Sequence, residues 1–293
     1  MAHWSGHIVA RNTLSADDLA AIRALGDLCN QADALNLKLN WDLMQMRSPE
    51  VVSDFCAYDG DALIGYAALD GDGDELELTG MVRPDHRRQG IARALIAAAL
   101  EECRRRGTQE LLLVSERASA SGRAFATASG GRFSFAEYHL ELDATAPPVA
   151  PASALHLRRA ERGDIPQLAD VQARCFAEPG EATEALVQRM ANRFDDPGSR
   201  YYRAFVRDEL VGQIGVLFEA DQLYIRGVAI LPEYRRHGYG RQMLAATVAA
   251  MFAEGQRHFS LDVATDNERA LGLYQSCGFH ETNVYEYYDL PLT

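Results

Sequence analysis

The chain has 293 residues, of which 47% are hydrophobic and 24% are charged, as is typical of a globular protein with two domains of ordinary size. Its net charge of −13 argues against nucleic acid as a general partner. The N-terminus lacks a secretory signal, no apolar stretch is long enough to span a bilayer and the five cysteines are scattered without a CxxC pair, so we expect a cytoplasmic protein with no membrane segment and no metal site.

The first half of the chain alternates strand and helix patterns. Ser15-Ala-Asp-Asp18 matches a helix-capping pattern ahead of apolar residues with helical spacing. The stretch Leu35–Met46 fits a strand or a helix, and its Trp41 and Met44 are candidates for contact with a substrate or for core packing. The other predicted elements are a strand at His7–Arg11, a hairpin of Phe55–Tyr58 and Leu63–Leu69, a strand at Glu75–Val82, a helix ending at Arg106 and a strand at Glu110–Ser115.

A composition change at Asp143–Ala154, with three prolines and no periodicity, predicts a linker between two domains. We therefore expect domains at residues 1–145 and 155–293, joined by residues 146–154. The second half repeats the order of the first, with strands at Leu155–Arg159, Tyr202–Val206, Val211–Phe218, Leu223–Leu231, Phe259–Ala264 and Val284–Leu290 and helices after Asp164 and at Asn267–Ser276. In each half this order predicts an α/β fold, in which helices flank a mixed, mostly antiparallel sheet.

The segment Val228–Gly240 combines an apolar strand, a proline-marked turn and an arginine-glycine loop, and a helical run begins at Arg241. The first N–H groups of a helix have no intrahelical partner, and the helix dipole is positive at that end. Gly238 and Gly240 let the backbone approach an anion closely. The segment therefore predicts a pyrophosphate site built mainly from backbone donors.

The same pattern occurs 148 positions earlier. Pro84 corresponds to Pro232, the pair Arg87-Arg88 to Arg235-Arg236, and Gly90 to Gly238. A shared order at one offset predicts a duplicated domain. Neither copy has the Gly-Lys-Ser/Thr of a nucleoside-triphosphate P-loop.

Both copies, Arg87-Arg-Gln-Gly-Ile-Ala92 and Arg235-Arg-His-Gly-Tyr-Gly240, resemble the Gln/Arg-x-x-Gly-x-Gly/Ala segment of the GCN5-related N-acetyltransferase (GNAT) family. The resemblance covers each half of the chain and is similar to the layout of tandem, two-domain members. It implies an acetyl-CoA-dependent N-acetyltransferase with a small-molecule or peptide amine as acceptor. The cofactor-binding residues that it implies are Val228, Ala229, Ile230, Arg235, Arg236, His237, Gly238, Tyr239, Gly240, Arg241 and Asn267, with Met81, Val82, Arg87, Arg88, Gln89, Gly90, Ile91, Ala92 and Arg93 in the first half.

The resemblance extends to a later helix, where family members often carry a tyrosine that protonates the leaving thiolate. Asn267 and Tyr274, followed by Gly278-Phe279, fit that segment, so Tyr274 is the expected general acid. In the first half Ala126 and Ser119 stand at the places of Tyr274 and Asn267. We therefore expect turnover in the second half and a catalytically degenerate first half.

A general base is less clearly marked. Glu219 and Asp221 precede the cofactor strand, where family members often place an acid, and Glu75 and Glu77 take the comparable place in the first half. We predict Glu219 as the base. A solvated acid at a strand start is the simpler alternative.

Two other functions fit the same sequence. One is a non-catalytic module that binds or senses acyl-CoA. The first half, which lacks the expected acid, favours this function in part. The other is an acyltransferase with a donor other than acetyl. The acceptor amine stays open, and no pattern indicates an oligomeric state.

Overall fold

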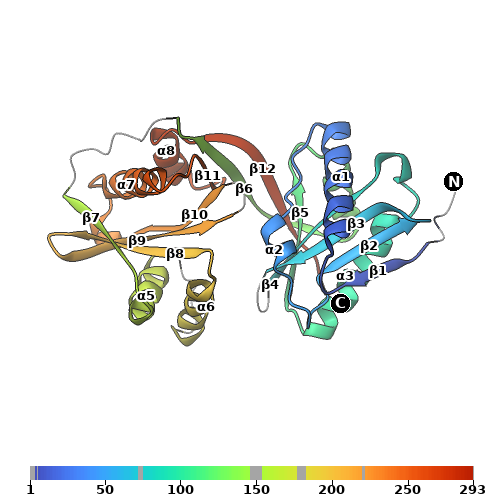
Figure 1. The fold of residues 1–293 in the computed structure, drawn as a ribbon, viewed down its shortest axis with the longest axis horizontal. Helices are drawn as coiled ribbons and strands as arrows, with labels where there is room; N and C mark the ends of the chain where they lie inside the picture. The colour runs from blue at the N-terminus through green and yellow to red at the C-terminus, as the bar shows by residue number, and fades with distance from the viewer. Residues whose placement is uncertain are drawn as a thin grey trace. The chain divides into compact units, whose positions relative to one another are not determined.

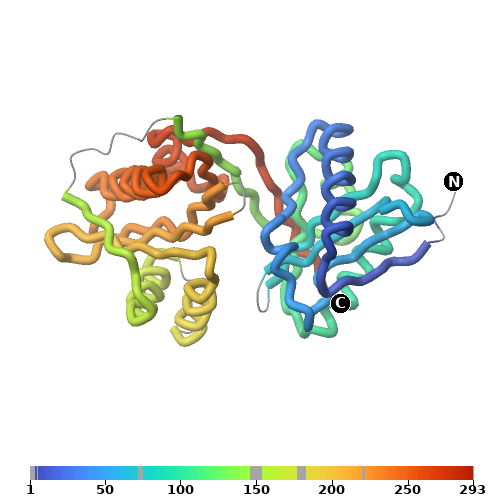
Figure 2. The backbone as a smooth tube through the Cα atoms, in the orientation of Figure 1, coloured from blue at the N-terminus to red at the C-terminus, as the bar shows by residue number. Residues whose placement is uncertain are grey.

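The computed structural model describes residues 4, 6–71, 75–145, 154–176, 183–219 and 222–292. These fall into two compact units (Figures 1 and 2). The first unit consists of Met1–Glu137 and Asn283–Thr293, and the second unit of Tyr138–Thr282. Within the described ranges, no helix is long and apolar enough to cross a membrane.

The first unit is a sheet with helices on both faces. Its strand order is β1-β2-β3-β4-β5-β12, antiparallel except for the parallel pair β4–β5. Helix α1 packs on one face through Ile22 and Cys29, and α3 packs on the other through Leu95 and Ala99. The elements are β1 (Ile8–Arg11), α1 (Ala16–Asp33), α2 (Trp41–Gln45), β2 (Asp54–Asp59), β3 (Ala62–Asp70), β4 (Glu75–Val82), α3 (Ile91–Arg106), β5 (Glu110–Glu116), α4 (Ala120–Ala128) and the ends of β6 (Arg132–Asp143) and β12 (His280–Asp289) that belong to this unit.

Local sequence signals account for the start of this unit. Ser15 Oγ accepts a hydrogen bond from the Asp18 amide at 3.1 Å, and the Asp18 carboxylate accepts one from the Ser15 amide at 2.9 Å. The predicted capping box is therefore formed. The ambiguous stretch is irregular as far as Asn40 and then becomes α2. Met44 is buried in the core between α1 and the sheet. Core packing therefore explains an apolar residue at this position, and no contact with a substrate is needed.

The second unit repeats this architecture. Its strand order is β6-β11-β10-β9-β8-β7, with β10 and β11 parallel. Helix α7 covers one face through Met243 and Val248, and α5 and α6 pack together on Tyr201 of β8. The elements are β7 (Leu155–Arg159), α5 (Ile165–Phe176), α6 (Thr183–Asp195), β8 (Ser199–Val206), β9 (Glu209–Phe218), β10 (Leu223–Ile230), α7 (Tyr239–Ala253), β11 (His258–Ala264), α8 (Glu268–Ser276) and the remaining parts of β6 and β12.

Two strands are exchanged between the sequence repeats. Strand β12, from the end of the second repeat, pairs with β5 of the first unit from Tyr285 to Asp289. Strand β6, from the end of the first repeat, is the neighbour of β11 in the second unit. The compact units therefore do not coincide with the ranges expected from composition, because residues 283–293 belong to the first unit. Residues 146–153 of the expected linker lie outside the described residues.

Candidate functional site

The two arginine-glycine loops have the same backbone geometry. Gly90 precedes α3 with φ 95°, and Gly238 precedes α7 with φ 76°. Arg88 and Arg236 also have left-handed φ angles, of 64° and 66°. Left-handed residues within a short loop turn backbone N–H groups toward a common point, which makes a concavity for anions.

Backbone donors are available at the start of both helices. The first intrahelical bond of α7 runs from the Gln242 amide to the Gly238 carbonyl at 3.1 Å, so the amides of Tyr239, Gly240 and Arg241 have no intrahelical acceptor. In the first unit Ala94 bonds Gly90 at 3.0 Å in the same way, which leaves the amides of Ile91, Ala92 and Arg93.

The first arginine of each loop binds the backbone of the preceding strand. Nε of Arg235 donates to the Ile230 carbonyl at 3.0 Å, and Nε of Arg87 donates to the Val82 carbonyl at 3.0 Å. Arg87 is also paired with Asp33 at 2.8 Å. These side chains therefore fix the loop against the end of the preceding strand.

The second arginine of each loop, Arg88 or Arg236, is exposed. The exposed His237 stacks on Tyr239 with ring centroids 5.6 Å apart, whereas Gln89, at the matching place in the first loop, is half-buried. The exposed arginines are therefore the ones whose charge is available to an anion.

In each unit the central parallel strands are paired only along their first residues. Pairing of β10 with β11 ends at Tyr224 and Ser260, and pairing of β4 with β5 ends at Leu78 and Leu113. We call the place where this pairing ends the fork of each unit. Backbone groups beyond a fork are available to another partner.

The fork of the second unit is followed by a bulge. The pairing of β10 with β9 shifts register between Arg226 and Ala229, and Gly227 has φ 59°. A bulge adds one residue and redirects the backbone groups that follow it, here those of Val228, Ala229 and Ile230. In the first unit β4 pairs with β3 without a shift from Glu77 to Val82, through Gly80 and Met81.

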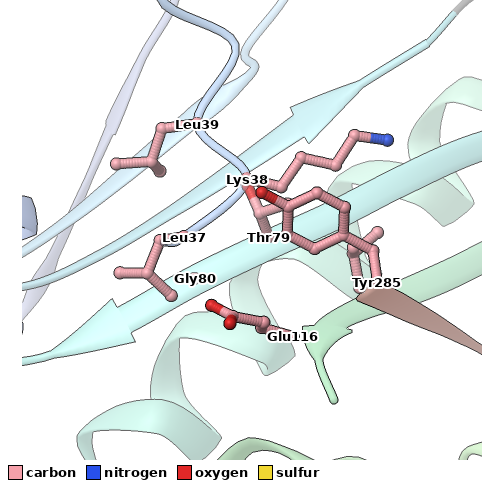
Figure 3. Close-up of a pocket in the computed structure, with 8 residues that line it drawn as sticks. Leu37, Lys38, Leu39, Thr79, Gly80, Glu116 and Tyr285 are labelled. Carbon is pink, nitrogen blue, oxygen red and sulfur yellow. The ribbon is translucent and has the colours of Figure 1, made fainter. Parts of the chain in front are cut away.

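The fork of the first unit is occupied by its own chain. Residues from the segment after α1, with Thr79 and Gly80 of β4, line a pocket of only about 20 Å³, which is room for roughly one water molecule. Figure 3 shows this segment lying across the strands, and the lining residues are Leu37, Lys38, Leu39, Thr79, Gly80, Val114, Glu116 and Tyr285. A thioester arm has no room there unless this segment moves.

Hydrogen bonds hold the segment in place. The Asn36 amide donates to Glu116 Oε2 at 2.6 Å, and the Tyr285 hydroxyl donates to the Asn36 carbonyl at 3.0 Å. Lys38 Nζ donates to Glu77 at 2.9 Å and contacts the Tyr287 hydroxyl at 2.8 Å. Glu77 is therefore engaged in an ion pair.

Tyr274 lies on α8 in the core of the second unit. Its side chain packs edge-on against Phe279, with ring centroids 6.4 Å apart. Burial, with a smaller contribution from the Cys277 thiol, raises the pKa of Tyr274 to about 12. Its hydroxyl has no hydrogen-bond partner among the described residues, so this buried phenol is a protonated donor. In the first unit the buried Ala126 takes its place on α4.

Asn267 caps α8, because its Oδ1 accepts a hydrogen bond from the Ala270 amide at 3.1 Å. Ser119 caps α4 in the same way, through the Gly122 amide at 3.1 Å. Capping alone therefore explains a polar residue at this position.

The predicted base Glu219 follows the last residue of β9. Its backbone N–H donates to the Gln222 carbonyl at 3.0 Å, and its carboxylate accepts from Gln222 Nε2 at 2.8 Å. Asp221 lies outside the described residues. In the first unit Glu75 is the exposed first residue of β4.

A polar cluster that sequence reasoning missed lies at the fork of the second unit. His139 Nδ1 is 2.6 Å from Asp262 Oδ1, and the Tyr224 hydroxyl donates to Asp262 Oδ2 at 3.0 Å. The three residues belong to β6, β11 and β10 and are far apart in the sequence. No local pattern could have brought them together.

The family model described as Acetyltransferase (GNAT) family matches residues 25–130 and 165–279. A mycothiol acetyltransferase from Thermobispora bispora is 28% identical over 286 residues, which cover 91% of this chain and 94% of the relative. An aminoglycoside N(6′)-acetyltransferase type 1 from Stenotrophomonas maltophilia is 26% identical over 150 residues, 48% of this chain and 96% of that protein.

Among solved structures, a GCN5-related N-acetyltransferase from Sphaerobacter thermophilus matches with a TM-score of 0.78 at 19% identity, over 97% of this chain and 96% of that one. This likeness concerns the fold. Two family-model matches on one chain agree with two similar units and with their matching loops. The chain is therefore an acetyltransferase that belongs to the GNAT family and contains the family's domain twice.

Proposed function

We propose that this protein transfers the acetyl group of acetyl-CoA to the primary amine of a small molecule, and that the second unit carries the chemistry. The observation behind this proposal is the difference between the two forks. The second has a bulge and a buried, protonated Tyr274 in the core against which Val228 and Ile230 pack. The first has neither and is filled by residues 36–39.

The loop of the second unit fits the pyrophosphate of CoA. Donors would come from the amides around Gly238 and at the start of α7, and the exposed Arg236 would add a charge. Val228, Ala229 and Ile230 would pair with the pantetheine arm through their backbone, as a further strand would. Asn267 would donate to the pantetheine or phosphate arm through its side-chain N–H groups, because its side-chain oxygen caps α8.

The chemistry follows from these positions. A redirected backbone N–H after the bulge would donate to the thioester oxygen and stabilise the charge that develops as the amine attacks. The C–N bond forms as the amine nitrogen gives one proton to a base, the C–S bond breaks, and the Tyr274 hydroxyl gives its proton to the leaving sulfur. Its raised pKa keeps this proton in place at neutral pH.

The names of the relatives support a small-molecule acceptor, because one is named for mycothiol and the other for aminoglycosides. The net charge of −13 would also attract a cationic amine. A panel of amino sugars, aminoglycosides, alkyl amines and a lysine peptide, assayed for thiol release from acetyl-CoA, tests this choice. Acetylation of the peptide alone would overturn the small-molecule assignment.

The intact first loop leads us to propose a second, weaker CoA site or a purely structural first unit, and calorimetry separates these. One CoA bound per chain, abolished by Gly238→Val, fits a structural first unit. Two bound per chain, one of them lost in Gly90→Val, fits a binding role. Tight CoA binding without acetylation of any amine in the panel would instead favour a sensing module.

A further inference from the structure

We propose that His139, held by Asp262, is the general base that accepts the proton of the acceptor amine in the second unit. This inference rests on the proposed function and adds a residue that the sequence analysis did not select. The side chains of His139 and Asp262 are only 14% and 13% exposed. They form a partly buried pair, as an imidazole base with an orienting carboxylate does.

The pair lies beside the reacting region. Tyr224 is the last residue of β10 that pairs with β11, and Asp262 lies two residues beyond its partner Ser260. The bulge begins two residues after Tyr224, at Arg226. The cluster therefore lies at the fork, directly before the backbone that would hold the thioester.

The pair and the proposed acid are on opposite faces of the sheet. Leu140, Leu223 and Leu261 contribute to the core beneath α7, and Tyr274 belongs to that same core. His139, Tyr224 and Asp262 are the immediate chain neighbours of these leucines, and successive side chains of a strand alternate between faces, so they point to the other face. An amine could thus approach from one face while the thiol leaves on the other.

The hydrogen bonds set the protonation of the imidazole. The Asp262 carboxylate accepts from Nδ1–H, which leaves the lone pair of a neutral ring on Nε2. The Tyr224 hydroxyl holds the second oxygen of Asp262. Glu141 Oε1 lies 3.5 Å from Nε2.

The proton balance is complete. Nε2 of His139 takes one proton from the amine nitrogen as the C–N bond forms, and the C–S bond breaks as the Tyr274 hydroxyl protonates sulfur. The imidazolium then loses a proton and the phenolate gains one by exchange with water. No further reactant is needed.

The first unit lacks this arrangement. The offset of 148 residues places Val114 at the position of Asp262, and its register partner on β12 is Tyr287. Both belong to an apolar cluster that also contains Leu112 and Tyr285. The His–Asp pair, the bulge and Tyr274 therefore all occur in the second unit and have no counterpart at the matching positions of the first.

The test compares full-length variants in thiol release from acetyl-CoA with the best amine of the panel. His139→Ala should lower kcat about 100- to 10,000-fold, the range for loss of a positioned base, and added imidazole should restore part of the rate. Affinity for CoA should not change. The matched control is His258→Ala, because His258 forms a similar 2.6 Å pair with Asp143 between the same strands, β11 and β6, but both side chains are more than 60% exposed. The control should keep full activity.

A second measurement does not depend on turnover. The nitrogen NMR signals of the His139 ring should show a neutral ring with hydrogen on Nδ1, and Asp262→Asn should change that tautomer population. Near-full activity of His139→Ala, with Glu219→Gln inactive, would overturn the inference and leave the proposed function intact. A wild-type protein that acetylates no amine would overturn both, and a His139 ring protonated on Nε2 would overturn this inference alone.

Discussion

The substitution Tyr274→Phe separates catalysis from folding because it removes one oxygen atom. The ring keeps its packing against Phe279, and no described residue loses a hydrogen bond. The free energy of unfolding should therefore change by less than about 1 kcal/mol. Loss of a positioned acid should lower kcat about 100- to 10,000-fold, which corresponds to roughly 2.7–5.4 kcal/mol of activation free energy.

The assay is thiol release at saturating acetyl-CoA, combined with calorimetry of CoA binding and urea unfolding. Tyr288→Phe is the matched control, since burial also raises the pKa of Tyr288 to about 12 and its hydroxyl donates to Glu286 at 2.8 Å. The control should lose about 1–3 kcal/mol of stability and keep its kcat. A Tyr274→Phe variant that folds, binds CoA and keeps its kcat would refute the assignment of the acid.

Three further results are expected. Gly238→Val should weaken CoA binding at least about tenfold, because a φ of 76° costs a β-branched residue roughly 1–2 kcal/mol. Gly238→Asn should weaken it less. Equal affinities of the two variants, measured by calorimetry, would contradict a role for the loop conformation. Arg88→Ala should keep most of the kcat. Complete loss of activity without unfolding would show that the chemistry takes place in the first unit. Burial raises the pKa of Tyr274 from 10.0 to about 12. The contribution of its protonated form to stability is therefore complete below pH 10 and is lost as the pH rises toward 12. Urea titrations should show that Tyr274→Phe loses less stability between pH 10 and pH 12 than the wild type does.

Local patterns were sufficient for much of the fold. The α/β class, the tandem arrangement and the capping box of α1 are confirmed. These features depend on residues within a few positions of one another. Helix α6 was missed, although Leu186 and Met190 have helical spacing, because the preceding residues gave no strong start signal.

The exchange of β6 and β12 could not be predicted in this way. A strand pattern states which face is apolar, but it does not state which strand is the neighbour, and β12 pairs with β5 across more than 150 positions of sequence. The same limit hid the pair of His139 with Asp262, which are 123 positions apart. The filled fork of the first unit was hidden because Asn36 and Lys38 are held by partners on distant strands.

The exchanged strands determine when each unit can fold during synthesis. Strand β5 pairs with β4 on one side, but its other edge has no partner until β12, at residues 280–289, has been made. The second unit receives β6 early, but β11, which pairs beside it, comes more than 100 residues later. Nascent chains usually fold their N-terminal domain first, but this chain exposes the edge of β5 until its last strand has been made. A fragment that ends before β12 should therefore aggregate through that edge, and synthesis of the C-terminus is the step that completes the first unit.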